Sequence, residues 1–87
     1  MKYTLLKRRK SVNVKSNSEF VTWMRKNDIE PWHTNEEFMK GYAHRKMTFE
    51  NIDIPYENPS LFVEALVKNN LLKIEKRMQN FWSFLKK

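Results

Sequence analysis

The chain has 87 residues, with 17 lysines and arginines against 10 acidic residues, no cysteine and one glycine. This length allows one hydrophobic core, so we expect a single domain over residues 1–87. The lack of cysteine excludes a disulfide scaffold and a thiolate-ligated zinc site, and one glycine is too few for a glycine-rich phosphate loop. No stretch reaches the ~20 apolar residues that span a bilayer. A 40% apolar content is too rich for a disordered chain, even at a mean hydropathy of −0.79. Together these features predict a small, soluble, cytoplasmic domain.

The positive charge is concentrated toward the two ends of the sequence. Residues 1–15 carry six basic and no acidic side chains, residues 16–70 have a net charge of −3, and residues 71–87 carry +4. The ends of small domains often lie close together, so we expect the two basic segments to form one positive surface. Such a surface is typical of proteins that bind nucleic acid or an acidic protein face, and a membrane surface is a less favoured partner.

The N-terminal segment has the pattern of short strands. Residues 2–14 contain one apolar run and one alternating run, which predicts one or two strands. Arg8–Ser11 between them contains no glycine, so a tight two-residue turn is not expected. The alternative is that residues 1–15 form a basic arm.

Three helices are predicted from their start signals. Ser16 with Glu19 and Thr34 with Glu37 have the spacing of a capping box, and Asn58 precedes a proline at the first helical position. The helices are expected to end at Asn27–Asp28, near residue 48, and at Asn69–Asn70. Gly41 falls in the middle of the second helix, where it costs roughly 1 kcal/mol relative to alanine. A glycine in such a position more often marks close packing by another element than a hinge.

The C-terminal segment allows two interpretations. Its apolar residues recur at steps of three and four, which predicts a fourth helix running nearly to residue 87; they are Leu71, Ile74, Met78, Phe81 and Leu85. The alternative is a strand over residues 71–74 that pairs with residues 3–7. We therefore expect a mainly α fold, a bundle of three to four short helices over residues 16–87 with a short N-terminal β element. It becomes α+β if residues 71–74 pair with residues 3–7.

The candidate binding residues come from the two basic ends. Phe84 falls on the basic side of the expected fourth helix, where an aromatic ring can stack on a base, fill a partner's pocket or pack on the N-terminal strand. Trp23, Trp32 and Trp82 are expected to be core or half-buried anchors. The candidate residues for binding nucleic acid or a partner protein are Lys7, Arg8, Arg9, Lys10, Lys73, Lys76, Arg77 and Phe84.

The sequence does not have the pattern of an enzyme. His33 and His44 are eleven residues apart without metal-ligand spacing, and the adjacent Glu36 and Glu37 cannot face each other across a substrate. We therefore expect a non-enzymatic regulatory protein that holds the phosphate backbone of nucleic acid. No cofactor is expected. The alternative is an inhibitor or adaptor of the phage or mobile-element type that docks on an acidic partner surface. The connection over residues 49–58 is too long for a helix-turn-helix motif.

Overall fold

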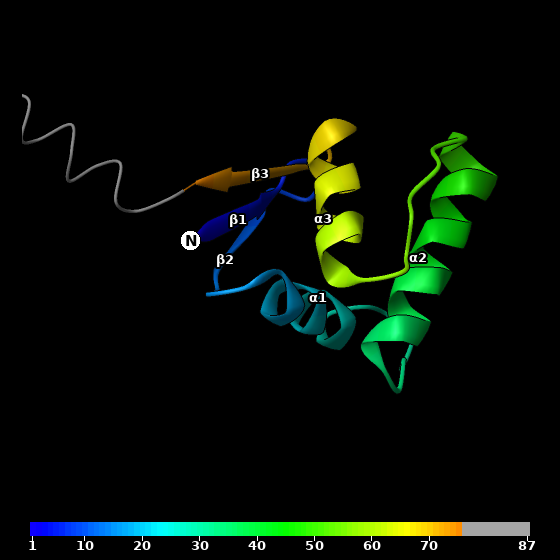
Figure 1. Cartoon of the computed structure of the whole chain (residues 1–87), viewed down its shortest axis with the longest axis horizontal. Coiled ribbons are helices and arrows are strands. Elements are labelled where there is room, and N and C mark those ends of the chain that lie inside the picture. Colours follow the sequence, from blue (N-terminus) through cyan, green and yellow to red (C-terminus); the bar gives the residue numbers. More distant parts are fainter. Residues whose placement is uncertain (76–87) are drawn as a thin grey trace, which may run out of the picture.

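The computed structural model describes residues 1–75, which form three helices and a three-stranded antiparallel sheet (Figure 1). The elements in chain order are β1 (Lys2–Leu5), β2 (Lys10–Asn13), α1 (Asn17–Lys26), α2 (Asn35–Glu50), α3 (Pro59–Lys68) and β3 (Leu72–Glu75). The described chain is therefore mixed α+β, which is the alternative stated above to a mainly α bundle: the three predicted helices are present, and residues 72–75 pair with β1 instead of beginning a fourth helix. The predicted N-terminal β element is confirmed as two strands, and the basic-arm alternative does not hold.

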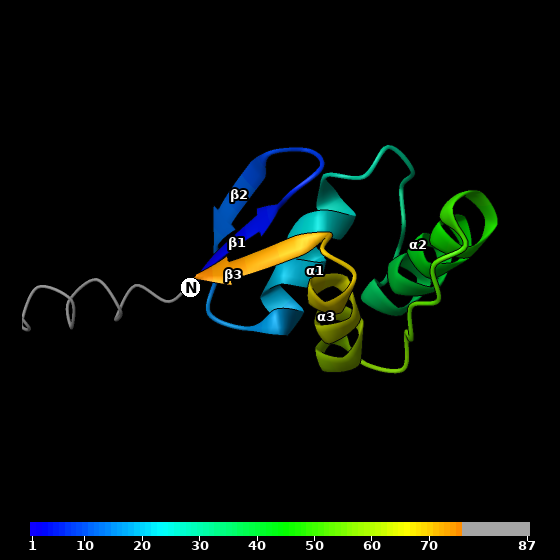
Figure 2. The same ribbon diagram turned by 90° about the horizontal axis from the view of Figure 1, so that it is seen from above.

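β1 is the central strand of the sheet, with β2 on one side and β3 on the other. Tyr3 lies opposite Val12 in β2 and opposite Ile74 in β3. Since neighbouring residues of a strand point to opposite faces, Tyr3, Leu5 and Leu72 all face the interior, where they are buried. Figures 1 and 2 show α1 and α3 next to the sheet and α2 beyond them.

The strand β3 corrects the predicted fourth helix. Residues 72–75 pair with β1, in the order Leu72 opposite Leu5 to Glu75 opposite Lys2. The alternation of buried Leu72 and half-buried Ile74 with exposed Lys73 and Glu75 suits this strand as well as the start of a helix. Pairing wins because β1 would otherwise leave its polar backbone groups open on that edge. The remainder of the predicted helix, with Met78, Phe81, Trp82 and Leu85, lies outside the described residues.

The three predicted helix starts are confirmed. The side chains of Ser16, Thr34 and Asn58 each accept a hydrogen bond from the backbone N–H three residues later. At the other end of α2, Asn51 adopts φ 56°, and the N–H of Ile52 donates to the carbonyl of Lys46. This left-handed C-terminal cap turns the chain back along α2.

The core lies between the sheet and the helices. Tyr3 stacks on Phe20 of α1 with a centroid distance of 4.6 Å, and Phe62 of α3 contacts both Phe38 and Tyr42 of α2. Phe20, Phe38 and Phe62 are at most 1% exposed. These aromatic contacts hold α2 against the rest of the domain.

Candidate functional site

The turn between β1 and β2 presents four consecutive basic residues, Lys7–Lys10. The connection is four residues long, with the N–H of Arg9 donating to the carbonyl of Leu5 at 2.8 Å. The expectation that no tight two-residue turn forms here is thus confirmed. Arg9 has φ 54°, a left-handed conformation that is costly for a residue with a Cβ. All four side chains are exposed.

Two basic residues of α2 join this turn. Lys7 Nζ donates to Oε1 of Glu50 at 2.7 Å, and Lys46 Nζ donates to the other oxygen of the same carboxylate at 2.7 Å. Arg45 pairs with Asp28 at 3.2 Å. We refer to these bases as the tip cluster, which consists of Lys7, Arg8, Arg9, Lys10, Arg45 and Lys46. The carboxylates of Glu50 and Asp28 pair with members of this cluster, so the six bases and two acids together have a net charge of +4.

Tyr42 lies beneath the two α2 cations of the tip cluster. Lys46 Nζ lies 5.4 Å from its ring centroid, and the guanidinium carbon of Arg45 lies 5.9 Å from it. Burial raises the pKa of Tyr42 to about 12, although the positive charges of Arg8 and Arg45 oppose this shift. The phenol therefore stays neutral. The ring provides an uncharged platform for two cations of α2, Arg45 and Lys46.

The pKa values of the two carboxylates that pair with the tip cluster, Glu50 and Asp28, are both lowered. Hydrogen bonds from Lys46 and Lys7 lower the pKa of Glu50 to about 2. Burial disfavours the charge on Asp28, but hydrogen bonds from Trp32 and Arg45 outweigh it and lower its pKa below the usual range. Glu50 thus neutralises part of the charge of Lys7 and Lys46. Within the tip cluster, Arg8, Arg9 and Lys10 are the cations without an ion-pair partner among residues 1–75.

The outer face of the sheet carries the remaining predicted cation that the structure describes. Lys73 lies opposite Thr4, which lies opposite Ser11 on the other side; the two hydroxyls are 2.9 Å apart. Lys2 lies on the same face beside Glu75. This face is polar, but its charges nearly cancel.

Within residues 1–75, the basic turn and Lys73 lie on different parts of the sheet. The basic turn follows Leu5, whereas β3 runs away from the turn and ends beside Lys2. Arg8 and Lys10 line a small hollow with Trp23, Asp28 and Tyr42, on the side of the helices, while Lys73 lies on the outer face. Of the predicted site residues, Lys76, Arg77 and Phe84 lie outside the described part of the chain. Sequence reasoning missed Arg45 and Lys46, for which the only signal was two adjacent bases on a helix.

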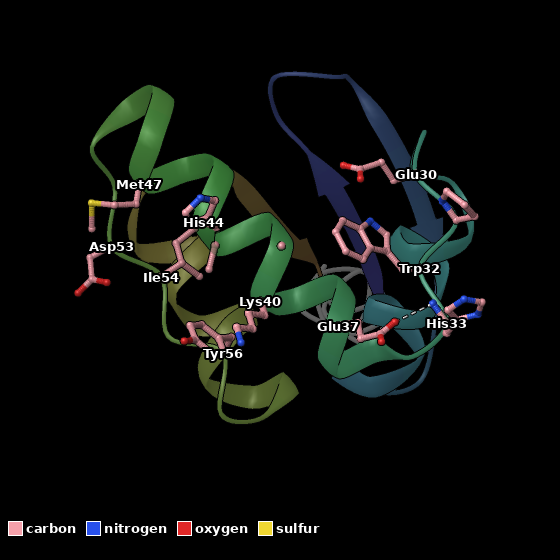
Figure 3. Close-up of a pocket in the computed structure, with 13 residues that line it drawn as sticks. Glu30, Trp32, His33, Glu37, Lys40, His44, Met47, Asp53, Ile54 and Tyr56 are labelled. Atoms are coloured by element: carbon pink, nitrogen blue, oxygen red, sulfur yellow. Dashed lines mark hydrogen bonds between the residues drawn. The ribbon is translucent and has the colours of Figure 1, made fainter.

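A groove of about 740 Å³ runs along the opposite side of α2 (Figure 3). At 100° per residue, Lys40, His44 and Met47 lie roughly opposite Tyr42 and Arg45 on this helix. Figure 3 shows the lining residues spread along α2, with Trp32 and Tyr56 on different sides of it. The groove is lined by Glu30, Pro31, Trp32, His33, Glu37, Lys40, Gly41, Ala43, His44, Met47, Asp53, Ile54 and Tyr56.

Trp32 is fixed in the groove wall from two sides. Its Nε1 donates to Oδ2 of Asp28 at 2.6 Å, and its carbonyl accepts from Arg25 at 3.2 Å. The predicted role of Gly41 as a site of close packing is confirmed, because a Cβ there would lie 2.7 Å from Cζ2 of Trp32. Trp23 and Trp32 are half-buried, as expected.

The described residues hold no cluster of three or more histidine, cysteine or acidic side chains that could bind a metal. No helix within residues 1–75 combines the length and apolar character needed to cross a membrane. Comparison of the chain with protein-family models, with curated proteins and with solved structures found no match. The tip cluster and the groove, on opposite sides of α2, are therefore the candidate functional surfaces of the described chain.

Proposed function

We propose that this protein is a non-enzymatic regulator that binds the phosphate backbone of nucleic acid through the tip cluster. The observation that carries this proposal is that Lys7 of the basic turn and Lys46 of α2 share the carboxylate of Glu50, while Arg45 and Lys46 lie over the ring of Tyr42. Cations held close together on a rigid support attract a polyanion more strongly than the same cations spread over a surface.

The kinds of side chain in the tip cluster favour contact with the backbone over reading of bases. Tyr42 is packed between Phe38 and Phe62 and is thus held in the core rather than offered for stacking. On the outer face of the sheet, residues 1–75 present lysines, hydroxyls and amides and no aromatic ring. Phosphate contacts position a protein on nucleic acid without specifying sequence.

The distribution of charge supports the same proposal. Residues 1–15 carry +6, while the 60 residues that follow in the described chain carry −3 in total. A polyanion is therefore attracted to the hairpin and repelled by most of the helical layer. This difference orients the molecule as it approaches nucleic acid.

The test is a titration of a labelled mixed-sequence DNA duplex, followed by fluorescence anisotropy over a range of salt concentrations. Each neutralised phosphate contributes about 0.9 to the log–log salt slope. The variant Arg8→Ala/Arg9→Gly/Lys10→Ala is expected to lower that slope by roughly 2–3. The matched control Lys26→Ala/Lys40→Ala/Lys68→Ala loses the same number of charges from exposed sites in α1, α2 and α3 and should bind nearly as the wild type does.

A further variant, Lys76→Ala/Arg77→Ala, measures what the C-terminal segment adds. A slope lowered equally by the turn variant and by the control would mean that only net charge matters, which contradicts a tip-cluster site. No binding to the duplex or to a single-stranded RNA at ~50 mM salt would reject the proposal. The alternative of docking on an acidic partner protein would then take its place.

A further inference from the structure

The groove on the other side of α2 has the chemistry of a peptide-binding site. Its apolar lining includes Trp32, Met47, Ile54 and Tyr56, and both Met47 and Tyr56 remain more than two-fifths exposed. A volume of about 740 Å³ lies within the range of sites that hold a ligand. An apolar hollow of this size loses unfavourable contact with water when a ligand covers it.

The charges around this groove are opposite in sign to those of the tip cluster. Glu30, Glu37 and Asp53 line it, against the single formal cation of Lys40. None of these four side chains has an ion-pair partner among residues 1–75. The three carboxylates are thus available to an incoming cation, and they repel an acidic ligand or a phosphate.

The dimensions of the groove fit a short segment of chain. It follows α2 from Glu37 to Met47, a rise of about 15 Å at 1.5 Å per residue. An extended peptide covers that length with about five residues. We infer that this groove binds a short cationic peptide segment of a partner protein, in which apolar side chains enter between Trp32 and Tyr56 and basic side chains meet the three carboxylates.

The site is separate from the proposed nucleic-acid surface, so the two proposals can fail independently. The two sites are linked through Asp28, which accepts hydrogen bonds from Trp32 of the groove wall and from Arg45 of the tip cluster. A protein with both sites would hold a basic partner and a nucleic acid on opposite sides of α2.

The experiment uses ¹H–¹⁵N NMR of the full chain and three blocked hexapeptides. The first alternates lysine with leucine, the second glutamate with leucine, and the third lysine with serine. The chain has a single glycine, so the Gly41 amide is an easily identified reporter within the groove. We expect the lysine–leucine peptide to shift the signals of Gly41 and of the Trp32 indole N–H, and the other two peptides to leave them unchanged.

Two variants test the contribution of the carboxylates. Glu37→Gln/Asp53→Asn should weaken binding of the lysine–leucine peptide roughly tenfold, because each exposed pair contributes up to about 1 kcal/mol. Glutamine at position 37 can still accept the hydrogen bond from the His33 N–H, so the start of α2 is preserved. The matched control Glu36→Gln/Glu64→Gln removes two exposed carboxylates outside the groove lining and should bind as the wild type does.

Three results would overturn the inference. The first is a response to one of the control peptides equal to that for the lysine–leucine peptide. With the glutamate–leucine peptide it would mean that the groove recognises apolar side chains alone, and with the lysine–serine peptide that it recognises positive charge alone. The second is an absence of change at Gly41 with all three peptides. The third is a shift of the Gly41 signal with protein concentration and no peptide, which would assign the groove to a second copy of this chain. The variant Arg8→Ala/Arg9→Gly/Lys10→Ala should leave peptide binding intact, whatever its effect on nucleic acid.

Discussion

The six-membered ring of the Trp32 indole occupies the space in which a side chain at position 41 would begin. Alanine in place of glycine normally stabilises a helix interior by about 1 kcal/mol. Here a Cβ would lie 2.7 Å from Cζ2 and 3.1 Å from Cζ3 of Trp32, and the indole is fixed by Asp28. We therefore expect Gly41→Ala to destabilise the protein by about 1–3 kcal/mol, the usual cost of overpacking.

The check is a double-mutant cycle measured by chemical denaturation. In the Trp32→Ala background the obstacle is gone, so Gly41→Ala should stabilise the helix by about 1 kcal/mol. The same sign of effect in both backgrounds would show that the two residues do not compete for this space.

Asp28 is expected to stabilise the loop after α1. Its carboxylate is 4% exposed and accepts hydrogen bonds from Trp32 and Arg45. Asp28→Asn loses the charge that both donors favour, which should cost about 1.5–3 kcal/mol at pH 7. Because the folded-state pKa is lowered, this stabilisation is complete above the ordinary carboxyl pKa and is lost as the pH falls through the folded-state value. Urea denaturation at neutral and acidic pH should therefore show the wild type and the variant converging in acid, and a constant difference would contradict this origin.

Glu50 allows a gain of binding to be tested. Its carboxylate neutralises part of the charge of Lys7 and Lys46, so Glu50→Gln should free both cations and tighten binding to a DNA duplex, with a steeper dependence on salt. The control is Glu64→Gln, which removes an exposed carboxylate from α3. If both variants bind DNA more tightly by the same factor, the gain comes from net charge alone and not from the release of Lys7 and Lys46.

Glu50 should also contribute to the dependence of stability on pH. With a folded-state pKa of about 2 against an ordinary value of 4.5, its ion pairs stabilise the protein above pH 4.5 and are lost as the pH falls toward 2. The melting temperature of the wild type should therefore fall more steeply across this pH window than that of Glu50→Gln. Parallel profiles would mean that solvent screens these pairs.

Arg9 is expected to be unfavourable for stability. Its φ of 54° is tolerated by glycine at little cost, whereas a residue with a Cβ loses about 1–2 kcal/mol there. Arg9→Gly should therefore raise the melting temperature while weakening the contact with phosphate. Arg8→Ala, one residue earlier, should lose a charge without this gain. A lower melting temperature for Arg9→Gly would show that the arginine side chain stabilises the turn.

Much of the helical part was predictable, because its signals are local. The starts of α1 and α2 follow from the hydroxyl caps at Ser16 and Thr34, and that of α3 from Asn58 and the proline after it. The location of β3 was not predictable from its own residues, since Leu72 and Ile74 fit a helical stripe and a strand equally well. The decision depends on pairing with Leu5 and Tyr3, at the other end of the described chain.

The two surfaces were less predictable than the fold. The turn bases were found from their charge, but Arg45 and Lys46 join them only because the fold brings α2 beside the turn. No sequence motif marks the groove, because it is formed by residues of two separate loops and of one side of α2. Its one local signal was Gly41, whose position indicated that another element packs closely there.

The pairing of β1 with β3 has a consequence for how the protein is made. Tyr3 and Leu5 belong to the first strand of this domain, but their partners Ile74 and Leu72 follow only after its three helices. While the chain is still being translated, the N-terminal hairpin therefore has one open edge, and a two-stranded ribbon alone is marginally stable in water. Contacts between such distant residues slow folding, so the final structure should form late and in one cooperative step. Emergence of β3 from the ribosome, rather than of the hairpin and helices that precede it, is the event that permits this domain to complete its sheet.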